Sequence, residues 1–333
     1  MRINELLNEN QIHDYQHGTI DSNHAPMTLI AMHELGASDQ ELETYFNSIK
    51  KEWNTQKLDI SRTGKLDRNN YSEFYGQRSY FSRFVDFFCL ELEHNGLTKT
   101  LEVYLPELAL APASAAYHPM IRLAYGIEFN NEQECTHALA YWASVYLKSP
   151  SVVQSDVKVS PDHLVQKIIN EYDFRKQEMQ GGVRARIQRY MEDPEFQKHA
   201  KGIDWKLDEL FEVTLRLFEE TQHFTLLHGV TSFHALRVIF PYVKNKKEAL
   251  DSYWVSVVAA YLTVLAMDTS KLSSSFSGND MEWKEVFKLS IKSETEHTIK
   301  LAYTAYKQEE FYEEKFNLKK LAIREIERAS PFI

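Results

Sequence analysis

The segment Ala-Ser-Asp-Gln-Glu-Leu-Glu-Thr-Tyr-Phe (residues 37–46) carries the clearest structural signal in the chain. The side chain of Ser38 or Asp39 can accept a hydrogen bond from the unpaired N–H groups at the start of a helix, and the acidic residues that follow complement the helix dipole. This pattern predicts a helix that begins at Ser38 or Asp39.

Similar helical patterns extend through most of the chain, and they lack the long two-residue alternation that is typical of strands. We expect further helices at residues 79–94, 98–105, 119–129, 132–147, 161–172, 207–223, 231–243, 247–267 and 281–308, and a polar-faced helix at the N-terminus. Clusters of Ser, Pro, Asp and Gly predict loops at 148–161 and 268–280. The chain is therefore expected to be all-α, with little sheet.

Composition and charge exclude several classes of function. The net charge of −10 repels phosphate backbones and anionic lipid surfaces, so nucleic acid and membranes are not expected partners. No run of 18 apolar residues occurs, and the first ten residues lack the apolar stretch of a signal peptide. We expect a soluble, cytoplasmic protein. Cys89 and Cys135 have no C-x-x-C spacing and are expected to be buried free thiols.

Four short segments place a histidine near a predicted helix start. They are Asn-His-Ala-Pro-Met (23–27), Tyr-His-Pro-Met-Ile-Arg (117–122), Leu-His-Gly-Val-Thr (227–231) and Glu-His-Thr-Ile-Lys (296–300). Proline suits the first turn of a helix because its missing N–H has no partner there. The Pro and Gly residues that follow these histidines predict helix entrances, and together the four imidazoles suggest a metal site. Their long spacings match no local metal-binding motif, and a single histidine is usually a core or surface residue with one partner.

At these four segments the chain resembles the questin oxidase family, whose fungal members oxidise and open anthraquinone rings. The resemblance extends from Asn-His-Ala-Pro-Met (23–27) to Glu-His-Thr-Ile-Lys-Leu-Ala (296–302), so it covers most of the chain. It is weakest at residues 151–206, which are a candidate region for determining which substrate is bound. Because the four segments range over the whole chain, we expect one multi-helix domain, residues 1–333, with a buried central metal site.

The resemblance implies a mononuclear non-haem iron centre, with Fe(II) held by His24, His118, His228, His297 and a lysine that CO2 has carboxylated. Lys300 is assigned as this lysine because it is three residues after His297 on one predicted helix, so both side chains leave the same face. Imidazole and carboxylate-type oxygen are donors that suit non-haem iron, and five protein ligands would leave one octahedral position open.

Three further residues are expected near the site. Arg122 is one helical turn beyond His118, where it could orient an anionic substrate as a catalytic residue or form an ion pair with an acid. Asn23 and Thr231 are expected to cap helices that begin near Ala25 and after Gly229.

The expected function is that of an oxidoreductase, a non-haem iron mono- or dioxygenase that uses O2 on a small aromatic, quinone-like or polyketide-like substrate, with ring cleavage as one outcome. One alternative is a cofactor-assisted Baeyer-Villiger monooxygenase, which would use NADPH. The 11 glycines form no G-x-G-x-x-G motif, so no nucleotide site is visible. A non-catalytic helical ligand-binding protein is the alternative from another class. The sequence carries no signal for oligomeric state.

Overall fold

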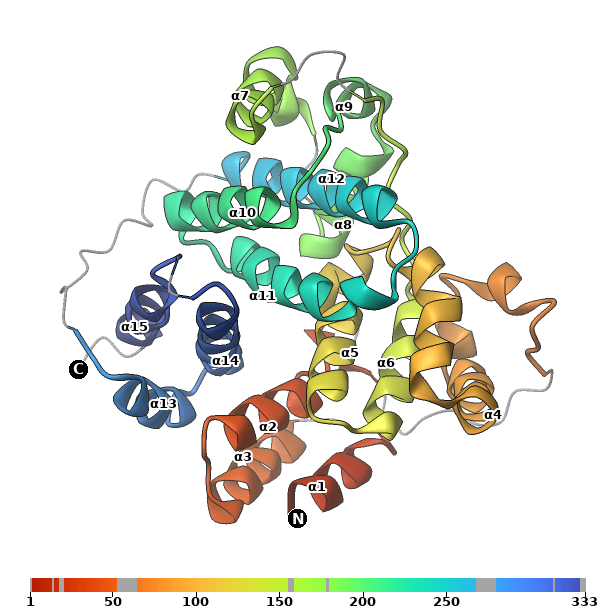
Figure 1. Cartoon of the computed structure of the whole chain (residues 1–333), viewed down its shortest axis with the longest axis vertical. Helices are drawn as coiled ribbons and strands as arrows, with labels where there is room; N and C mark the ends of the chain where they lie inside the picture. Colours follow the sequence, from red (N-terminus) through yellow and green to blue (C-terminus); the bar gives the residue numbers. More distant parts are fainter. Residues whose placement is uncertain are drawn as a thin grey trace. The chain divides into compact units, whose positions relative to one another are not determined.

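The computed structural model describes residues 2–13, 15–17, 21–52, 65–154, 159–177, 180–267, 280–313 and 315–329. These residues are almost entirely helical (Figure 1). Within them, the sheet consists of one short antiparallel pair, β1 (Gln16–His17) and β2 (Asp21–Ser22). The prediction of an all-α fold is confirmed.

The chain forms two compact units, each assembled from separate stretches of sequence. The terminal unit consists of Met1–Thr63, Ile121–His137 and Ser274–Ile333, and the central unit of Gly64–Met120 and Ala138–Ser273. Neither unit is continuous, so no sequence boundary divides the chain into two consecutive domains. The single domain expected over residues 1–333 stays a prediction.

The terminal unit is built around helix α14. It contains α1 (Arg2–Asn10), α2 (Ala25–Glu34), α3 (Asp39–Glu52), α13 (Trp283–Ile291), α14 (Glu296–Phe311) and α15 (Leu318–Ala329). Helix α14 packs against α15, α13 and α2, although α2 is far away in the sequence. Two helices, α5 (His118–Glu128) and α6 (Glu132–Ser144), have residues in both units.

The central unit is built around helix α12 (Lys246–Leu265), which packs against α8, α10 and α11. Every residue of α12 from Ala249 to Val264 is buried, because this helix is apolar on all sides and its neighbours surround it. The other elements of the unit are η1 (Tyr71–Phe74), η2 (Arg78–Tyr80), α4 (Phe81–Leu108), η3 (Ser114–Tyr117), α7 (Pro161–Glu171), η4 (Phe174–Lys176), α8 (Val183–Glu192), α9 (Pro194–His199), α10 (Leu207–Thr221), α11 (Phe224–Ile239) and η5 (Phe240–Tyr242).

Several predicted helix boundaries are confirmed, and others are wrong. Helix α4 is interrupted at Gly96, whose φ of 71° lies in the left-handed region, as expected from helices at 79–94 and 98–105. Helix α11 begins at Phe224 and not at Thr231. The single helix expected at 281–308 is divided into α13 and α14, because Thr295 accepts a hydrogen bond from the N–H of Thr298 and starts a new helix.

The remaining elements include helices that were not predicted, namely α8, α9 and α15. The described residues of the expected loop at 148–161 form no helix before Pro161. Most of the expected loop at 268–280 lies outside the described residues.

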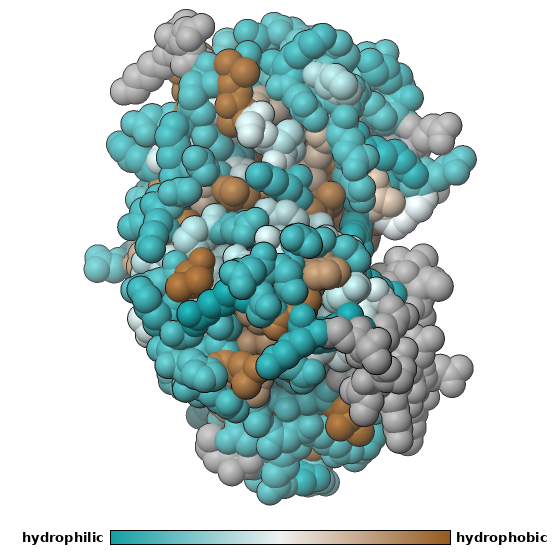
Figure 2. Space-filling view, turned by 90° about the vertical axis from the view of Figure 1, so that its right-hand side faces the viewer, coloured by the Kyte–Doolittle hydropathy of each residue, from teal (hydrophilic) through white to brown (hydrophobic). Residues whose placement is uncertain are grey.

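Hydrophilic residues cover most of the described surface in the face that Figure 2 shows, and hydrophobic residues are scattered among them. Cys135 is buried as expected, but the prediction of a buried Cys89 is wrong, because this thiol is exposed on α4. None of the helices in the described residues combines the length and the apolar character needed to span a bilayer.

Candidate metal centre

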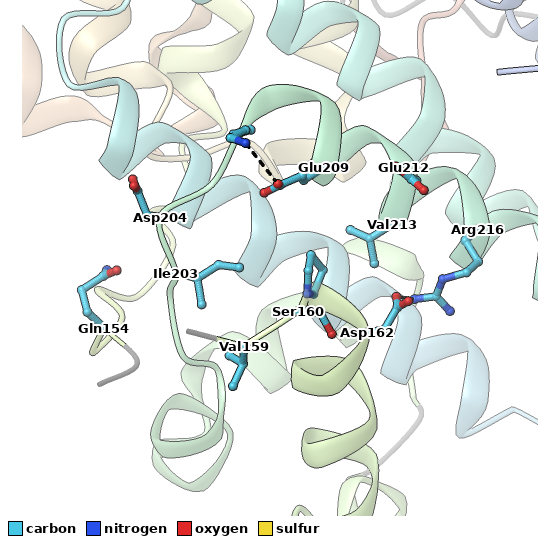
Figure 3. Close-up of a pocket in the computed structure, with 12 residues that line it drawn as sticks. Gln154, Val159, Ser160, Asp162, Ile203, Asp204, Glu209, Glu212, Val213 and Arg216 are labelled. Carbon is cyan, nitrogen blue, oxygen red and sulfur yellow. Dashed lines mark hydrogen bonds and ion pairs between the residues drawn. The ribbon is translucent and has the colours of Figure 1, made fainter. Parts of the chain in front are cut away.

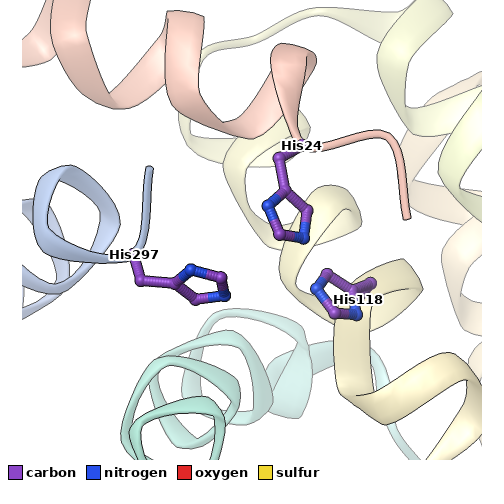
Figure 4. Close-up of side chains that lie close together, drawn as sticks. All are labelled: His24, His118 and His297. Carbon is purple, nitrogen blue, oxygen red and sulfur yellow. The ribbon is translucent and has the colours of Figure 1, made fainter. Parts of the chain in front are cut away.

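Within the terminal unit, His24 and His297 are in contact. His24 precedes the first residue of α2, and His297 is the second residue of α14. The two ring centroids are 5.0 Å apart and the rings are nearly perpendicular, at 88°. Since α2 and α14 pack against each other, their first turns bring these histidines together. The predicted helix entrance is confirmed for His24, and Figure 4 shows His24 and His297 beside the first turns of their helices.

The start of α2 is fixed by Asn23, which is buried. Its Oδ1 accepts a hydrogen bond from the N–H of Ala25 at 3.0 Å, and its side-chain amide donates to Oδ1 of Asn10 at 3.0 Å. Asn23 therefore bonds to the first N–H of α2, as a capping residue would, although the N-cap position itself is His24. The hydrogen bond to α1 also holds the residue that precedes His24.

Within the central unit, His118 and His228 form a second pair. Their ring centroids are 4.9 Å apart at an interplanar angle of 64°. His118 is the first residue of α5, as predicted (Figure 4). The entrance predicted for His228 is wrong, because this residue lies one turn inside α11. Thr231 also lies inside α11, where its hydroxyl bonds to the carbonyl of Leu227, so its predicted capping role is wrong as well.

Gly229 lies inside α11 because α10 approaches closely at this point. A Cβ at Gly229 would be 3.3 Å from Cγ2 of Thr214 on α10, which is tighter than ordinary van der Waals contact. The absence of a side chain therefore permits the packing of α10 against α11, at a cost of about 1 kcal/mol in helix propensity.

Nδ1 lies close to an oxygen acceptor in His24, His118 and His228. Nδ1 of His118 is 2.6 Å from the carbonyl oxygen of Ala115, and Nδ1 of His228 is 2.8 Å from that of Phe224. Nδ1 of His24 is 3.4 Å from Oε2 of Glu296. A carbonyl oxygen only accepts, so Nδ1 of His118 and of His228 carries a hydrogen, and in the neutral imidazole Nε2 is then the nitrogen with the lone pair. Metal-bound histidines usually show this arrangement, since the bond at the other nitrogen fixes the tautomer and the ring orientation.

Lys300 is buried on α14, one turn after His297, and only 2% of its surface is exposed. Among the described residues, no carboxylate lies within ion-pair distance of its Nζ. Burial lowers the pKa of Lys300 to about 8, while the charge of Glu296 acts in the opposite direction. The Tyr125 hydroxyl donates to the main-chain carbonyl of Lys300 at 3.2 Å. A buried lysine without an acidic partner is unusual, because charged side chains are rarely buried unless they are paired.

Arg122 lies one turn after His118 on α5, and it forms a buried ion pair with Glu134 of α6. Nε of Arg122 is 2.8 Å and Nη2 is 2.7 Å from Oε2 of Glu134. Only 3% of the arginine side chain and none of the glutamate side chain is exposed. Of the two roles expected for Arg122, this geometry favours the ion pair.

His137, also on α6, is buried near Arg122. Burial and the positive charge of Arg122 lower its pKa to about 3, so this imidazole is neutral at physiological pH. Sequence reasoning gave His137 no special role, and it also missed Glu134 and Glu296 as partners of site residues. The acids are so frequent in the sequence that no local signal singles these two out.

A separate cavity of about 1000 Å³ lies in the central unit (Figure 3). Its described lining includes none of the four histidines. Asp162 and Arg216 form an ion pair across part of it, as do Lys206 and Glu209 at 3.8 Å. The described lining carries the carboxylates of Asp162, Asp204, Glu209 and Glu212, which suit a cationic or hydrogen-bonding ligand better than a flat uncharged aromatic ring.

The fold and these side chains together define a helical protein with two contacting histidine pairs, each in its own unit, and a buried lysine beside one of them. A family model described as questin oxidase-like matches residues 22–305, which covers most of the chain. The chain belongs to the questin oxidase-like family, which confirms the resemblance seen in the sequence. The match includes all five expected metal ligands.

The chain is also similar to three fungal proteins. A Baeyer-Villiger oxidase of Pestalotiopsis microspora is 29% identical over 152 residues, which cover 42% of this chain and 34% of that protein. A Baeyer-Villiger oxidase of Paecilomyces divaricatus is 30% identical over 152 residues, with 42% and 33% covered. A Baeyer-Villiger monooxygenase of a Cryptosporiopsis species is 29% identical, with 42% and 34% covered. The aligned segment thus spans about a third of the length of these relatives.

Proposed function

We propose that this protein is an oxidoreductase that binds Fe(II) through His24, His118, His228, His297 and a carboxylated Lys300, and that uses O2 to oxidise an aromatic or polyketide-like ring. The observation that carries the proposal is the hydrogen bonding of Nδ1 in His118 and His228, which leaves Nε2 of each as the nitrogen with the lone pair. The family membership and the oxidase names of the relatives support an oxygenase activity.

The donor set suits this ion. Imidazole nitrogens and carboxylate-type oxygens are usual ligands of non-haem iron, and bound Fe(II) would supply the electrons that activate O2. Carboxylation of Lys300 forms a bond between its Nζ and the carbon of CO2 and releases a proton. The product is an anionic oxygen donor, which offsets part of the metal charge. The burial of Lys300 without an acidic partner among the described residues supports this role, because the modified side chain would gain a cation to neutralise it.

The other residues of the chain position these donors. Glu296 can accept the Nδ1 proton of His24, and the carbonyls of Ala115 and Phe224 accept those of His118 and His228. These bonds hold the imidazoles in one orientation before a metal arrives. Arg122 could orient an anionic substrate only with the part of its guanidinium that Glu134 does not engage.

The names of the relatives favour a second candidate, a Baeyer-Villiger monooxygenase. We expect such an enzyme to require NADPH. In that reaction one oxygen atom of O2 enters a ring C–C bond to form a lactone. The other atom leaves as water, with two electrons from NADPH. An iron dioxygenase would instead place both atoms in the product without NADPH.

The metal is tested with two variants of helix α11. His228 and His234 are both buried on this helix, but only His228 is a proposed ligand, whereas Nδ1 of His234 lies 3.3 Å from Nη2 of Arg237. Iron per chain is measured after anaerobic reconstitution of His228→Gln and His234→Gln, with circular dichroism to verify folding. We expect a large loss of iron in His228→Gln alone. Equal iron content in the two folded variants would remove His228 from the site.

The reaction is tested with a hydroxylated anthraquinone as the probe substrate. The iron-loaded protein is incubated with ¹⁸O2, with and without NADPH, and the product mass and NADPH oxidation are recorded. We expect product that contains ¹⁸O and forms without NADPH. Product formation that requires stoichiometric NADPH would support the second candidate. If O2 is consumed no faster than in buffer without protein for every quinone tested, the result would favour a ligand-binding protein.

A further inference from the structure

The three residues before His118 have an unusual backbone conformation. Ala115, Ala116 and Tyr117 have φ angles of 43°, 53° and 71°, all in the left-handed region, and none of them is glycine. The other non-glycine residues with positive φ in the described chain are single, at Asn130, Gln222 and Glu313. Each left-handed residue with a side chain costs on the order of 1–2 kcal/mol, so this turn persists only because its surroundings hold it.

The contacts that hold the turn all belong to the central unit. The N–H of Ala116 donates to the carbonyl of Ala113 at 3.0 Å. The Ser114 hydroxyl donates to the carbonyl of Ala111 at 2.8 Å, and its oxygen accepts from the N–H of Leu147 at 2.9 Å. The Tyr117 side chain is fully buried. These bonds, together with the burial of Tyr117, hold the turn and offset its strain.

The turn places one acceptor where His118 needs it. In His228 the Nδ1 hydrogen bonds to the carbonyl of Phe224, four residues earlier on the same regular helix. His118 is the first residue of α5, so no right-handed turn of its own α-helix precedes it, and the residues before it form η3, which is left-handed at Ala115 and Ala116. The left-handed turn brings the carbonyl of Ala115 to 2.6 Å from Nδ1 of His118 instead.

We infer that the left-handed turn Ala115–Tyr117 is a positioning element that fixes His118 in the tautomer with hydrogen on Nδ1 and the lone pair on Nε2. Ala115 acts through its main-chain oxygen and is a positioning residue. The inference rests on the proposed function in one respect, the role of His118 as a ligand. The tautomer itself is a property of the metal-free protein.

The tautomer is measured by long-range ¹H–¹⁵N correlation of ¹⁵N-histidine protein without metal at pH 8, and the His118 signals are assigned from their loss in His118→Gln. We expect the ¹⁵N shifts of a protonated Nδ1 and an unprotonated Nε2. A lone pair on Nδ1 of His118, or a rapid average of both tautomers, would overturn the inference. This measurement on the wild type tests the tautomer even if a variant does not fold.

Two variants at Ala116 test whether the turn is responsible. Glycine adopts a φ of 53° without strain, so Ala116→Gly should keep the tautomer and raise the thermal midpoint by about 1–3 °C. The β-branched side chain in Ala116→Val opposes this conformation, so we expect mixed tautomers at His118 and an affinity for Fe(II) lowered roughly 10-fold or more. An unchanged tautomer in a destabilised Ala116→Val protein would show that the turn has only a structural role.

The two proposals can fail separately. A fixed Nε2 lone pair in a protein that binds no iron would refute the proposed metal centre but not the inference about the turn. Iron binding with an averaged His118 tautomer would refute the inference and leave the metal centre standing.

Discussion

The buried ion pair between Arg122 and Glu134 allows a double-mutant cycle that separates a structural role from a substrate-binding role. Arg122→Met leaves the Glu134 carboxylate, which is fully buried, without its counter-charge, and Glu134→Leu leaves the guanidinium in the same position. Breaking a buried ion pair by removing one partner typically costs about 3–5 kcal/mol. Each single variant is expected to lose that much stability.

The double variant Arg122→Met/Glu134→Leu removes both charges and fills the space with apolar atoms. Replacing a whole buried pair in this way is often neutral or stabilising, so we expect a net loss below about 1 kcal/mol and a large coupling energy. The free energy of unfolding is measured by urea titration, with fluorescence and circular dichroism compared as a test of two-state behaviour. Additive losses in the double variant would refute the argument that the two charges depend on each other.

The same four proteins test the other role of Arg122. A purely structural arginine predicts that the double variant keeps the KM of the wild type for the anthraquinone probe. A KM raised 10-fold or more in the stable double variant would instead show that the guanidinium contacts substrate despite its bond to Glu134.

Three further predictions concern stability. The pKa of about 3 at His137 lies below its ordinary value of 6.5, so the folded chain binds fewer protons than the unfolded chain between these pH values. The free energy of unfolding therefore falls as pH falls through this window, by up to roughly 1.4 kcal/mol per pH unit. His137→Gln should flatten this part of the plot of urea midpoint against pH, and parallel plots for variant and wild type would count against a buried neutral imidazole. A Cβ at Gly126 would lie 3.1 Å from Sγ and 3.2 Å from the main-chain nitrogen of Cys135. Gly126→Ala should therefore lower the free energy of unfolding, measured by urea titration, by about 1–3 kcal/mol. A gain in stability would contradict this packing. Lys300→Met should raise the thermal midpoint of the metal-free protein, because it removes a buried amine. Lys300→Glu should retain more iron than Lys300→Arg, because it keeps an anionic oxygen. An iron content in Lys300→Arg equal to that of the wild type would rule out the carbamate.

The helical class and many helix starts could be predicted because their signals are local. Pro161 with Ser160 before it, and Asp39 after Ser38, mark helix starts that the structure contains. The interruption of α4 was also predictable, since Gly96 separates two helical patterns and takes a left-handed conformation there.

The errors arose where packing between distant segments overrides a local signal. Gly229 looked like a helix boundary, but it lies inside α11 because Thr214 of α10 packs against it. Cys89 was expected inside on apolar neighbours alone, although its position on α4 leaves it exposed. Glu134 as the partner of Arg122 depends on how α5 and α6 pack, which no spacing in the sequence reveals.

The four histidine segments and the family resemblance predict the candidate ligands, and the structure adds the contacts within each pair. The left-handed turn before His118 could not be predicted, because Ala115 and Ala116 have no intrinsic preference for that conformation. Such strain is visible only once the contacts of Ser114 and Tyr117 are known.

The assembly of the terminal unit from three separate segments also has a consequence for protein synthesis. Its segments run from Met1 to Thr63, through Ile121–His137, to Ser274–Ile333, so α2 must wait for α14 to leave the ribosome before the two can pack. The segments of the central unit have by then all been translated. The part of α2 that packs on α14 therefore stays without its partner until α14 has been translated, and exposed apolar surface of this kind is what chaperones bind. The contact between His24 and His297 can form only after α14 has been translated, so metal loading through both residues would also have to wait until then.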